Sequence, residues 1–422
     1  MSSRLWSLPV FRLIATDRCR VAAPWFVWTH GRDGTSMLRA LAITVERSRL
    51  GHITLLEQVT AAIAYFPLSV VTIVRALRRW GRALLAEYGV SRTRQCAQLA
   101  AYVWRVGLCP RMYYQMRLHR HSWKKTGRHF IDQPELHHLQ RLLAPTEIDA
   151  LEDKLLFSER ASRHGLPIVP ILAIWREGSR VLMNAGAPVR PLPPHDIFVK
   201  PAVSYSSAGV MGFRFNPATG HFFDERRTWT PAELTAHLDA RSRQHALLVQ
   251  PWLRNARELR GFSDGALCNF RVVTGRHPGG RVRPVMAALR FPWRSRLSCA
   301  EPGITLCAGV ALESGLLSAA EAKEPAIGRL VRHPVTGQQI EGFRVPSWGA
   351  ILESALAAHA HWAEFPFIGW DIALADDGIR LLEGSSLWGG ALAQMSGSAP
   401  LGLTAFPEIY LANLAERQRP VP

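Results

Sequence analysis

The sequence has few lysines and few cysteines. Six cysteines are scattered along the chain without a C-x-x-C pair, a pattern that favours isolated thiols in a reducing compartment over a disulfide framework. We therefore predict a cytoplasmic protein. Only five of the 51 basic residues are lysines, so the position of each lysine is informative. They are Lys124, Lys125, Lys154, Lys200 and Lys323.

Several other features are missing. The first 20 residues interrupt their apolar stretch with Arg12 and Asp17, so we expect no cleavable signal peptide. We find no internal repeat, no low-complexity tract, no nucleic-acid-binding motif and no Ser/His/Asp or Cys/His arrangement. Nucleic acid is therefore not an expected partner, and a side-chain nucleophile is not indicated. With 422 residues, 48% hydrophobic and 20% charged, the chain reads as a globular protein of two or three domains.

Positive charge is concentrated in the N-terminal third. Residues 1–145 hold 22 Lys and Arg against 7 Asp and Glu, a net charge of +15 out of the total of +18. Within this region residues 58–74 carry no charge, and four arginines follow them by position 82. A buried core helix is the simplest interpretation, while a helix on an anionic membrane surface and a true membrane span stay open. For the basic region we predict peripheral, salt-sensitive contact with anionic lipid at the inner face of the membrane.

Apolar periodicity predicts helices over residues 37–120, 146–164 and 350–363, and near 318–330. A further helix is predicted from the Thr230-Pro231 cap to 242. Strands and helices mix without strict alternation, so we predict an α+β fold with antiparallel sheets. The predicted strands are 168–173, 197–200, 210–215, 246–250, 269–274, 283–290, 305–312, 370–375 and 379–383.

The run Phe198-Val-Lys200-Pro is followed by a loop of small residues, 204–209. Small side chains let backbone N–H groups approach phosphate oxygens, and a lysine adds positive charge. The lysine precedes the loop, unlike in the Walker motif. A strand with an ordinary polar hairpin remains the alternative.

Two carboxylates flank a predicted hairpin whose turn is Asp376-Asp-Gly. The hairpin would place Asp371 and Glu383 on neighbouring strands at the same end, where they could hold Mg²⁺ with phosphates completing its shell. Two unrelated carboxylates at the rim of the sheet are the alternative.

Arg271 and Arg290 have apolar alternate neighbours, so they would line one face of a sheet and suit a phosphoryl or carboxylate oxygen, or form structural ion pairs. Asp153-Lys154 lies on a predicted helix. An exposed helical ion pair is the alternative to a role at a nucleotide.

In this order, these motifs resemble the ATP-grasp superfamily, and more closely its sugar-transfer-associated group. The resemblance covers roughly 142–414, and the basic helical region before it is also similar. The matching stretches are Asp153-Lys154-Leu-Leu-Phe157, Ile197-Phe-Val-Lys-Pro201, Asn269-Phe-Arg-Val-Val-Thr274, His333-Pro-Val-Thr-Gly337, Gly342-Phe-Arg-Val-Pro-Ser-Trp348 and Gly369-Trp-Asp371.

The resemblance implies an ATP-grasp fold, in which two α+β lobes with antiparallel sheets sandwich Mg-ATP. It implies a basic helical region at 1–141, a first lobe at 142–245 and a second lobe at 246–422. For ATP, the resemblance implies that Lys154 and Lys200 contact the nucleotide, that the loop with Ser206, Ser207 and Gly209 closes over the phosphates, and that the hinge Gln250, Pro251, Trp252 and Leu253 binds adenine. It implies that Arg271 and Arg290 bind the transferred phosphate and the acyl oxyanion. It implies that Asp371 and Glu383 bind Mg²⁺.

Two positions depart from the family pattern. Ser385 stands where the family usually carries Asn, and a hydroxyl ligates Mg²⁺ less well than an amide oxygen. The stretch 298–304 replaces a usual Asp-Asn followed by paired glycines. The first departure puts metal affinity in question, and the second puts substrate contacts in question.

The resemblance implies an ATP- and Mg²⁺-dependent ligase that joins a small carboxylate to an amine or thiol through an acyl phosphate. The family name implies tailoring of a surface polysaccharide or secondary metabolite. A phosphotransferase acting on a hydroxyl, or a weakly active nucleotide-binding module at the membrane, stay as alternatives. The sequence identifies neither substrate nor the oligomeric state.

Overall fold

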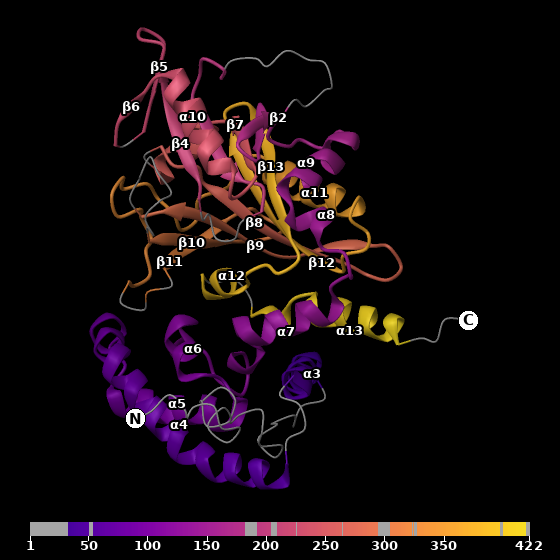
Figure 1. Ribbon diagram of the computed structural model, residues 1–422. Helices are drawn as coiled ribbons and strands as arrows, with labels where there is room; N and C mark the ends of the chain where they lie inside the picture. Colours follow the sequence, from indigo (N-terminus) through magenta and orange to yellow (C-terminus); the bar gives the residue numbers. More distant parts are fainter. Residues whose placement is uncertain are drawn as a thin grey trace, which may run out of the picture.

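The chain folds into three tiers, shown in the ribbon of the computed structural model (Figure 1). A seven-stranded sheet with its helix forms one end, a six-stranded sheet lies in the middle, and N-terminal helices form the other end. The structure describes residues 33–49, 54–181, 192–203, 209–224, 226–263, 265–293, 304–322, 324, 327–396 and 400–418.

The N-terminal tier is helical, as predicted. Its α-helices are α3 (Gly34–Arg49), α4 (Leu55–Tyr88), α5 (Arg92–Val106), α6 (Pro110–Gln115) and α7 (Gln133–Leu143), with 3₁₀ turns η3 (Leu118–Arg120) and η4 (Gly127–His129) between α6 and α7. Helix α4 begins with a capping box between Thr54 and Glu57, and it ends at Gly89 in the left-handed conformation. The predicted boundary between 141 and 142 falls within α7.

The seven-stranded sheet, here called the smaller sheet because its strands are short, has the strand order β2-β1-β7-β3-β4-β5-β6, with every pairing antiparallel. Helix α10 (Pro231–Ser242) packs against it, and its capping box at Thr230 confirms the predicted start. The strands are β1 (Ala173–Arg176), β2 (Ser179–Val181), β3 (Ile197–Pro201), β4 (Met211–Asn216), β5 (His221–Phe223), β6 (Thr228–Trp229) and β7 (Leu247–Pro251).

The six-stranded sheet, here called the larger sheet because its strands are longer, has the order β11-β10-β9-β8-β12-β13 and is also antiparallel. Side chains alternate between its faces, so Phe270 and Leu289 pack against α11 while Val273 and Met286 face the opposite way, toward α7 and α13. Its elements are β8 (Asn269–Arg276), β9 (Val282–Pro292), β10 (Thr305–Val310), β11 (Leu317–Ala322), β12 (Phe367–Ala375), β13 (Gly378–Ser385), the preceding η5 (Arg257–Phe262) and the helix α11 (Trp348–Ala360).

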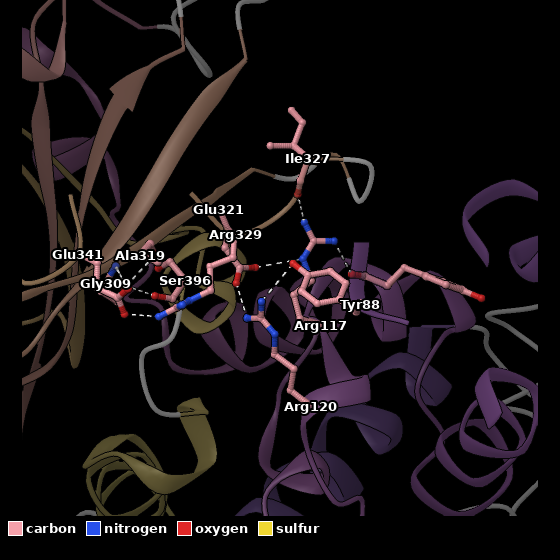
Figure 2. A network of polar contacts seen from close by, with 12 residues as sticks. Tyr88, Arg117, Arg120, Gly309, Ala319, Glu321, Ile327, Arg329, Glu341 and Ser396 are labelled. Carbon is pink, nitrogen blue, oxygen red and sulfur yellow. Dashed lines mark hydrogen bonds and ion pairs between the residues drawn. The ribbon is translucent and has the colours of Figure 1, made fainter. Parts of the chain in front are cut away.

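The helical tier packs against the larger sheet through apolar and ionic contacts. Elements α12 (Ala391–Met395) and α13 (Phe406–Arg417) contact strands of the larger sheet, and α13 and η6 (Leu401–Leu403) contact α3 of the helical tier. Figure 2 shows the ionic part: Glu321 of β11 pairs with Arg117 at 3.1 Å and with Arg120 at 2.6 Å. The Arg117 and Glu321 side chains are 1% and 2% exposed, so this is a buried ion pair.

Three sequence predictions need correction. The described residues of the predicted helix near 318–330 are not helical: residues 318–322 belong to β11, whose alanines pack in the sheet core. The helix predicted over 146–164 is two helices, α8 (Asp149–Glu152) and α9 (Lys154–Arg163). They divide at Asp153 because its extended backbone and its carboxylate, which accepts from two N–H groups, cap α9. The strand predicted at 168–173 begins only at Ala173.

Candidate functional site

Two lysines lie where the two sheets meet. Lys154 is the first residue of α9, and its backbone N–H donates to the carbonyl of Ala202, just beyond β3, at 3.0 Å. Its Nζ lies 3.7 Å from Oε2 of Glu383 on β13. Lys200 lies on β3 of the smaller sheet, and its Nζ donates to the Leu382 carbonyl of β13 at 3.5 Å. Both lysines therefore connect the smaller sheet to the same strand of the larger one.

Burial alters the protonation of Lys200. Its side chain is buried, and removal from water lowers the pKa of its ammonium group to about 8. The positive charge of Lys154 lowers this pKa further, whereas Glu383 and Asp371 oppose the shift. Two buried ammonium groups that repel each other suit a ligand that brings several negative charges, such as a nucleotide phosphate.

The predicted hairpin holds the two acidic residues in register. Asp371 of β12 pairs directly with Glu383 of β13, with a bulge beyond this pair. The pKa of Glu383 is raised by burial and by repulsion from Asp371, although its side chain is 38% exposed to solvent. Hard oxygen ligands that repel one another fit a divalent cation such as Mg²⁺, because the cation would remove that repulsion.

Asp371 is held between two arginines. Arg271 Nε and Nη2 donate to its two carboxylate oxygens at 2.7 and 3.1 Å, and Arg290 Nη2 lies 2.5 Å from Oδ2. Burial alone would raise the pKa of Asp371, but the two guanidinium groups overcome this and hold it below its usual range. The arginines do share one face of the sheet, as predicted. In the structure both arginines form ion pairs with Asp371, which is the structural alternative to oxyanion binding named in the sequence analysis.

The predicted hinge is the end of a central strand in the smaller sheet. In β7, Gln250 and Pro251 pair with Phe198 and Ile197 of β3. Gln250 donates its side-chain amide to the Val169 carbonyl at 3.1 Å, and the Trp252 N–H donates to the Asp196 carbonyl at 3.1 Å. Adenine binding by 250–253, including Leu253, stays a prediction, because these contacts show only how the segment is held.

The small-residue loop is described only at its end. Gly209 has φ +78°, and a Cβ atom there would lie 3.0 Å from Cγ of Pro201, so glycine suits this return of the chain toward β3. Ser206 and Ser207 lie outside the described residues, as do Lys323 and the divergent stretch at 298–303.

Ser385 lies on β13 beyond Glu383, and its hydroxyl is 3.4 Å from Oε1 of Glu152. The next residue, Ser386, holds the same oxygen more closely, with both its N–H and its hydroxyl at 2.7 Å. Ser385 therefore makes only a long contact there. Its predicted role as a metal ligand is not tested by this geometry.

Two neighbours of the site were missed by the sequence analysis. Asn269 Oδ1 accepts from Arg290 Nε at 3.2 Å, and Asn269 stands two residues before Arg271 on the same strand face. The period of two along the strand was a usable signal for Asn269. Glu152 had no such signal, because only the fold of α8 against β13 brings it to Ser385 and Ser386.

Comparison with known proteins gives one family match. Residues 137–405 match the model described as sugar-transfer associated ATP-grasp, which confirms the resemblance and the predicted fold class. Among curated proteins no match was found.

Solved structures similar to the chain include N5-carboxyaminoimidazole ribonucleotide synthetase in an ADP complex (11% identity, TM-score 0.33, 65% of this chain and 56% of that one). They also include D-alanine-D-alanine ligases from Helicobacter pylori (12%, 0.32, 64% and 59%) and, with ATP, from Bacillus anthracis (10%, 0.34, 64% and 68%). The chain thus spans less than two thirds of the length of the first two.

Proposed function

Because the chain belongs to the sugar-transfer associated ATP-grasp family, we propose that it is an ATP- and Mg²⁺-dependent ligase that joins a carboxylate to an amine or thiol. The observation that carries the proposal is the convergence of Lys154 and Lys200 on β13, next to the register pair Asp371 and Glu383. Two lysines that could bind phosphates and two carboxylates that could bind a metal thus lie together at the junction of the two sheets.

In the proposed reaction, a carboxylate oxygen of the substrate attacks the γ-phosphorus of ATP, and the bond to the bridging oxygen breaks to release ADP. The amine or thiol then attacks the acyl carbon and loses a proton, and the bond between the acyl carbon and the phosphate oxygen breaks, so that phosphate leaves as the new bond forms. Lys154 and Lys200 would bind the phosphates and balance their charge. Arg271 and Arg290 contact Asp371, and in this proposal they would neutralise negative charge on the transferred group and on the oxyanion.

Asp371 and Glu383 would hold Mg²⁺, with Ser385 as the neighbouring hydroxyl. The metal would supply charge neutralisation at the phosphate oxygens. Because Asp371 is engaged by both arginines, we expect the arginines to share this carboxylate with the metal or to move toward the phosphoryl oxygens. Ser385→Asn, which would add an amide oxygen, is expected to tighten Mg-ATP binding.

We propose small carboxylates and amines or thiols as substrates, and tailoring of a surface polysaccharide or secondary metabolite as the setting. The test is a screen of carboxylates and amines for ADP and phosphate release, with Lys200→Ala as the blank. Release that depends on both substrates supports a ligase. A stable phosphorylated product formed without an amine would instead establish a phosphotransferase, and the ligase proposal would fail.

A further inference from the structure

The outer face of α4 is apolar and exposed over its first five turns. Leu56, Ile63, Val70 and Val74 follow one another at helical spacing, and they are 74%, 72%, 46% and 39% exposed. Others on the same side are Leu55, Val59, Phe66 and Val71. Within the described residues, α4 is also the one helix whose length and apolar composition would allow it to cross a membrane. Only 33% of its most apolar window is buried, so the core-helix interpretation holds for one face alone.

The inner face of α4 fixes how the helix is oriented. Tyr65 donates its hydroxyl to the Val103 carbonyl of α5 at 3.1 Å, and Trp104 of α5 donates to the hydroxyl of Ser69 at 2.8 Å. Ala62, Ile73 and other residues on this side are packed into the helical core. The apolar outer face therefore cannot turn inward without breaking these contacts.

Four arginines follow the apolar stripe along the sequence of α4. Arg75, Arg78, Arg79 and Arg82 are exposed and occupy the next two turns of α4. Arg75 and Arg79 also line a cavity of about 270 Å³, together with Arg111. Its other lining residues are mostly apolar, among them Tyr65, Leu68, Trp80 and Leu108. An apolar stripe followed by a cationic, half-apolar cavity matches the acyl chains and acidic headgroups of a phospholipid.

We propose that the outer face of α4 lies in the interface of an anionic phospholipid bilayer, parallel to its plane. The apolar stripe would sit at the boundary between headgroups and acyl chains, and the arginines would bind lipid phosphates. A membrane is favoured over a protein partner because the N-terminal third carries a net charge of +15, which complements an anionic surface. It is favoured over a span because the inner face is packed against α5 and α6.

Such docking would also keep the candidate site at a fixed distance from the bilayer surface. Helix α4 ends at Tyr88, whose hydroxyl accepts from Arg120 at 3.1 Å, and Arg120 pairs with Glu321 of the larger sheet. Figure 2 shows these residues joining the helical tier to the sheet. This proposal does not depend on the ligase reaction.

The test is vesicle flotation of the full chain, using phosphatidylcholine alone or mixed with phosphatidylglycerol, in low and high salt. We expect strong flotation with the anionic vesicles, reduced but not abolished by salt, because salt screens the arginines and leaves the apolar contact. Equal flotation with both lipids, or none with either, would overturn the proposal.

One variant tests the stripe. Leu56→Gln/Ile63→Gln/Val70→Gln keeps good helix formers but removes apolar area, and it should lower the partition coefficient by about tenfold or more in either salt. The matched control Val335→Gln/Leu403→Gln changes exposed apolar residues elsewhere and should bind as the wild type does. Circular dichroism checks that each variant is folded. If the stripe variant turned a dimer into a monomer and left flotation unchanged, the surface would belong to a second copy of the chain.

A second variant tests the charge. Arg78→Gln/Arg82→Gln, which removes two positive charges, should lower partitioning onto anionic vesicles by about 25-fold in low salt, since each basic residue near such a surface adds about fivefold. The effect should shrink in high salt. Arg241→Glu, an exposed arginine of α10, is the control and should leave flotation unchanged. An equal loss in the control would mean that net charge, and not this helix, drives binding.

Discussion

Raising the pH through 8 is expected to weaken nucleotide binding, because Lys200 loses its proton there. Burial lowers the pKa of this ammonium group to about 8, whereas an exposed lysine would stay charged well beyond that pH. If only the protonated form binds phosphate, Lys200 is about nine-tenths competent at pH 7 and about one-tenth at pH 9. The affinity for ATP should then fall by about tenfold between these values.

The measurement is ATP affinity by titration calorimetry across this pH range at constant Mg²⁺ and ionic strength. The phosphates of ATP are already ionised above about pH 7, so their own protonation contributes little. Binding near pH 8 should also take up a proton, because phosphate favours the charged lysine. The heat of binding should therefore depend on the ionisation enthalpy of the buffer.

Two variants act as controls. Lys200→Met should bind ATP more weakly at pH 7 and show a flat profile, and Lys200→Arg, charged throughout, should also be flat. An affinity in the wild type that does not change between these pH values, with no proton uptake, would refute the assignment of Lys200 as a phosphate ligand with a depressed pKa.

Two further predictions concern stability. Glu321→Gln leaves Arg117 buried without its carboxylate and should lower the unfolding free energy by about 3–5 kcal/mol in denaturant titrations, whereas Glu341→Gln, at an exposed ion pair, should cost less than about 1 kcal/mol. Similar losses of unfolding free energy in the two variants would contradict a stabilising role for the buried ion pair. Burial lowers the pKa of His359 to about 4, so the unfolded chain takes up a proton below about pH 6.5 while the folded chain does not. The unfolding free energy should therefore drop by about 2–3 kcal/mol on acidification to about pH 4.5, and His359→Asn should remove this drop. A variant whose unfolding free energy depends on pH as that of the wild type does would refute the assignment to His359.

The order of motifs along the chain was sufficient to predict the fold class. Lys200 at the end of a strand, the Asp376-Asp-Gly turn and the apolar runs around Asp371 are local signals, and the structure places each in the predicted type of element. The cap at Thr230 likewise predicted the start of α10 to the residue. These predictions succeeded because hairpin turns and helix caps depend on residues within a few positions of each other.

Predictions failed where burial outweighed local pattern. The alanine-rich run that forms β11 has good helix formers, yet its Ala320 and Ala322 pack into the core of the larger sheet, and pairing with β10 determines its conformation. In the same way, one helical pattern around Asp153 became two helices, because α8 packs against β13 while α9 begins beside β3.

The sequence by itself determined which chemical groups are available: two lysines, two arginines and two carboxylates in a family-specific order, and the uncharged run 58–74 followed by arginines. Only the tertiary structure decided their partners. It paired Asp371 with both arginines, lowered the pKa of Lys200 by burial, and turned the apolar side of α4 outward. The physical reason is that spacing sets the face on which a residue lies. Exposure and charge pairing, in contrast, depend on segments that are distant in the chain and meet only in the fold.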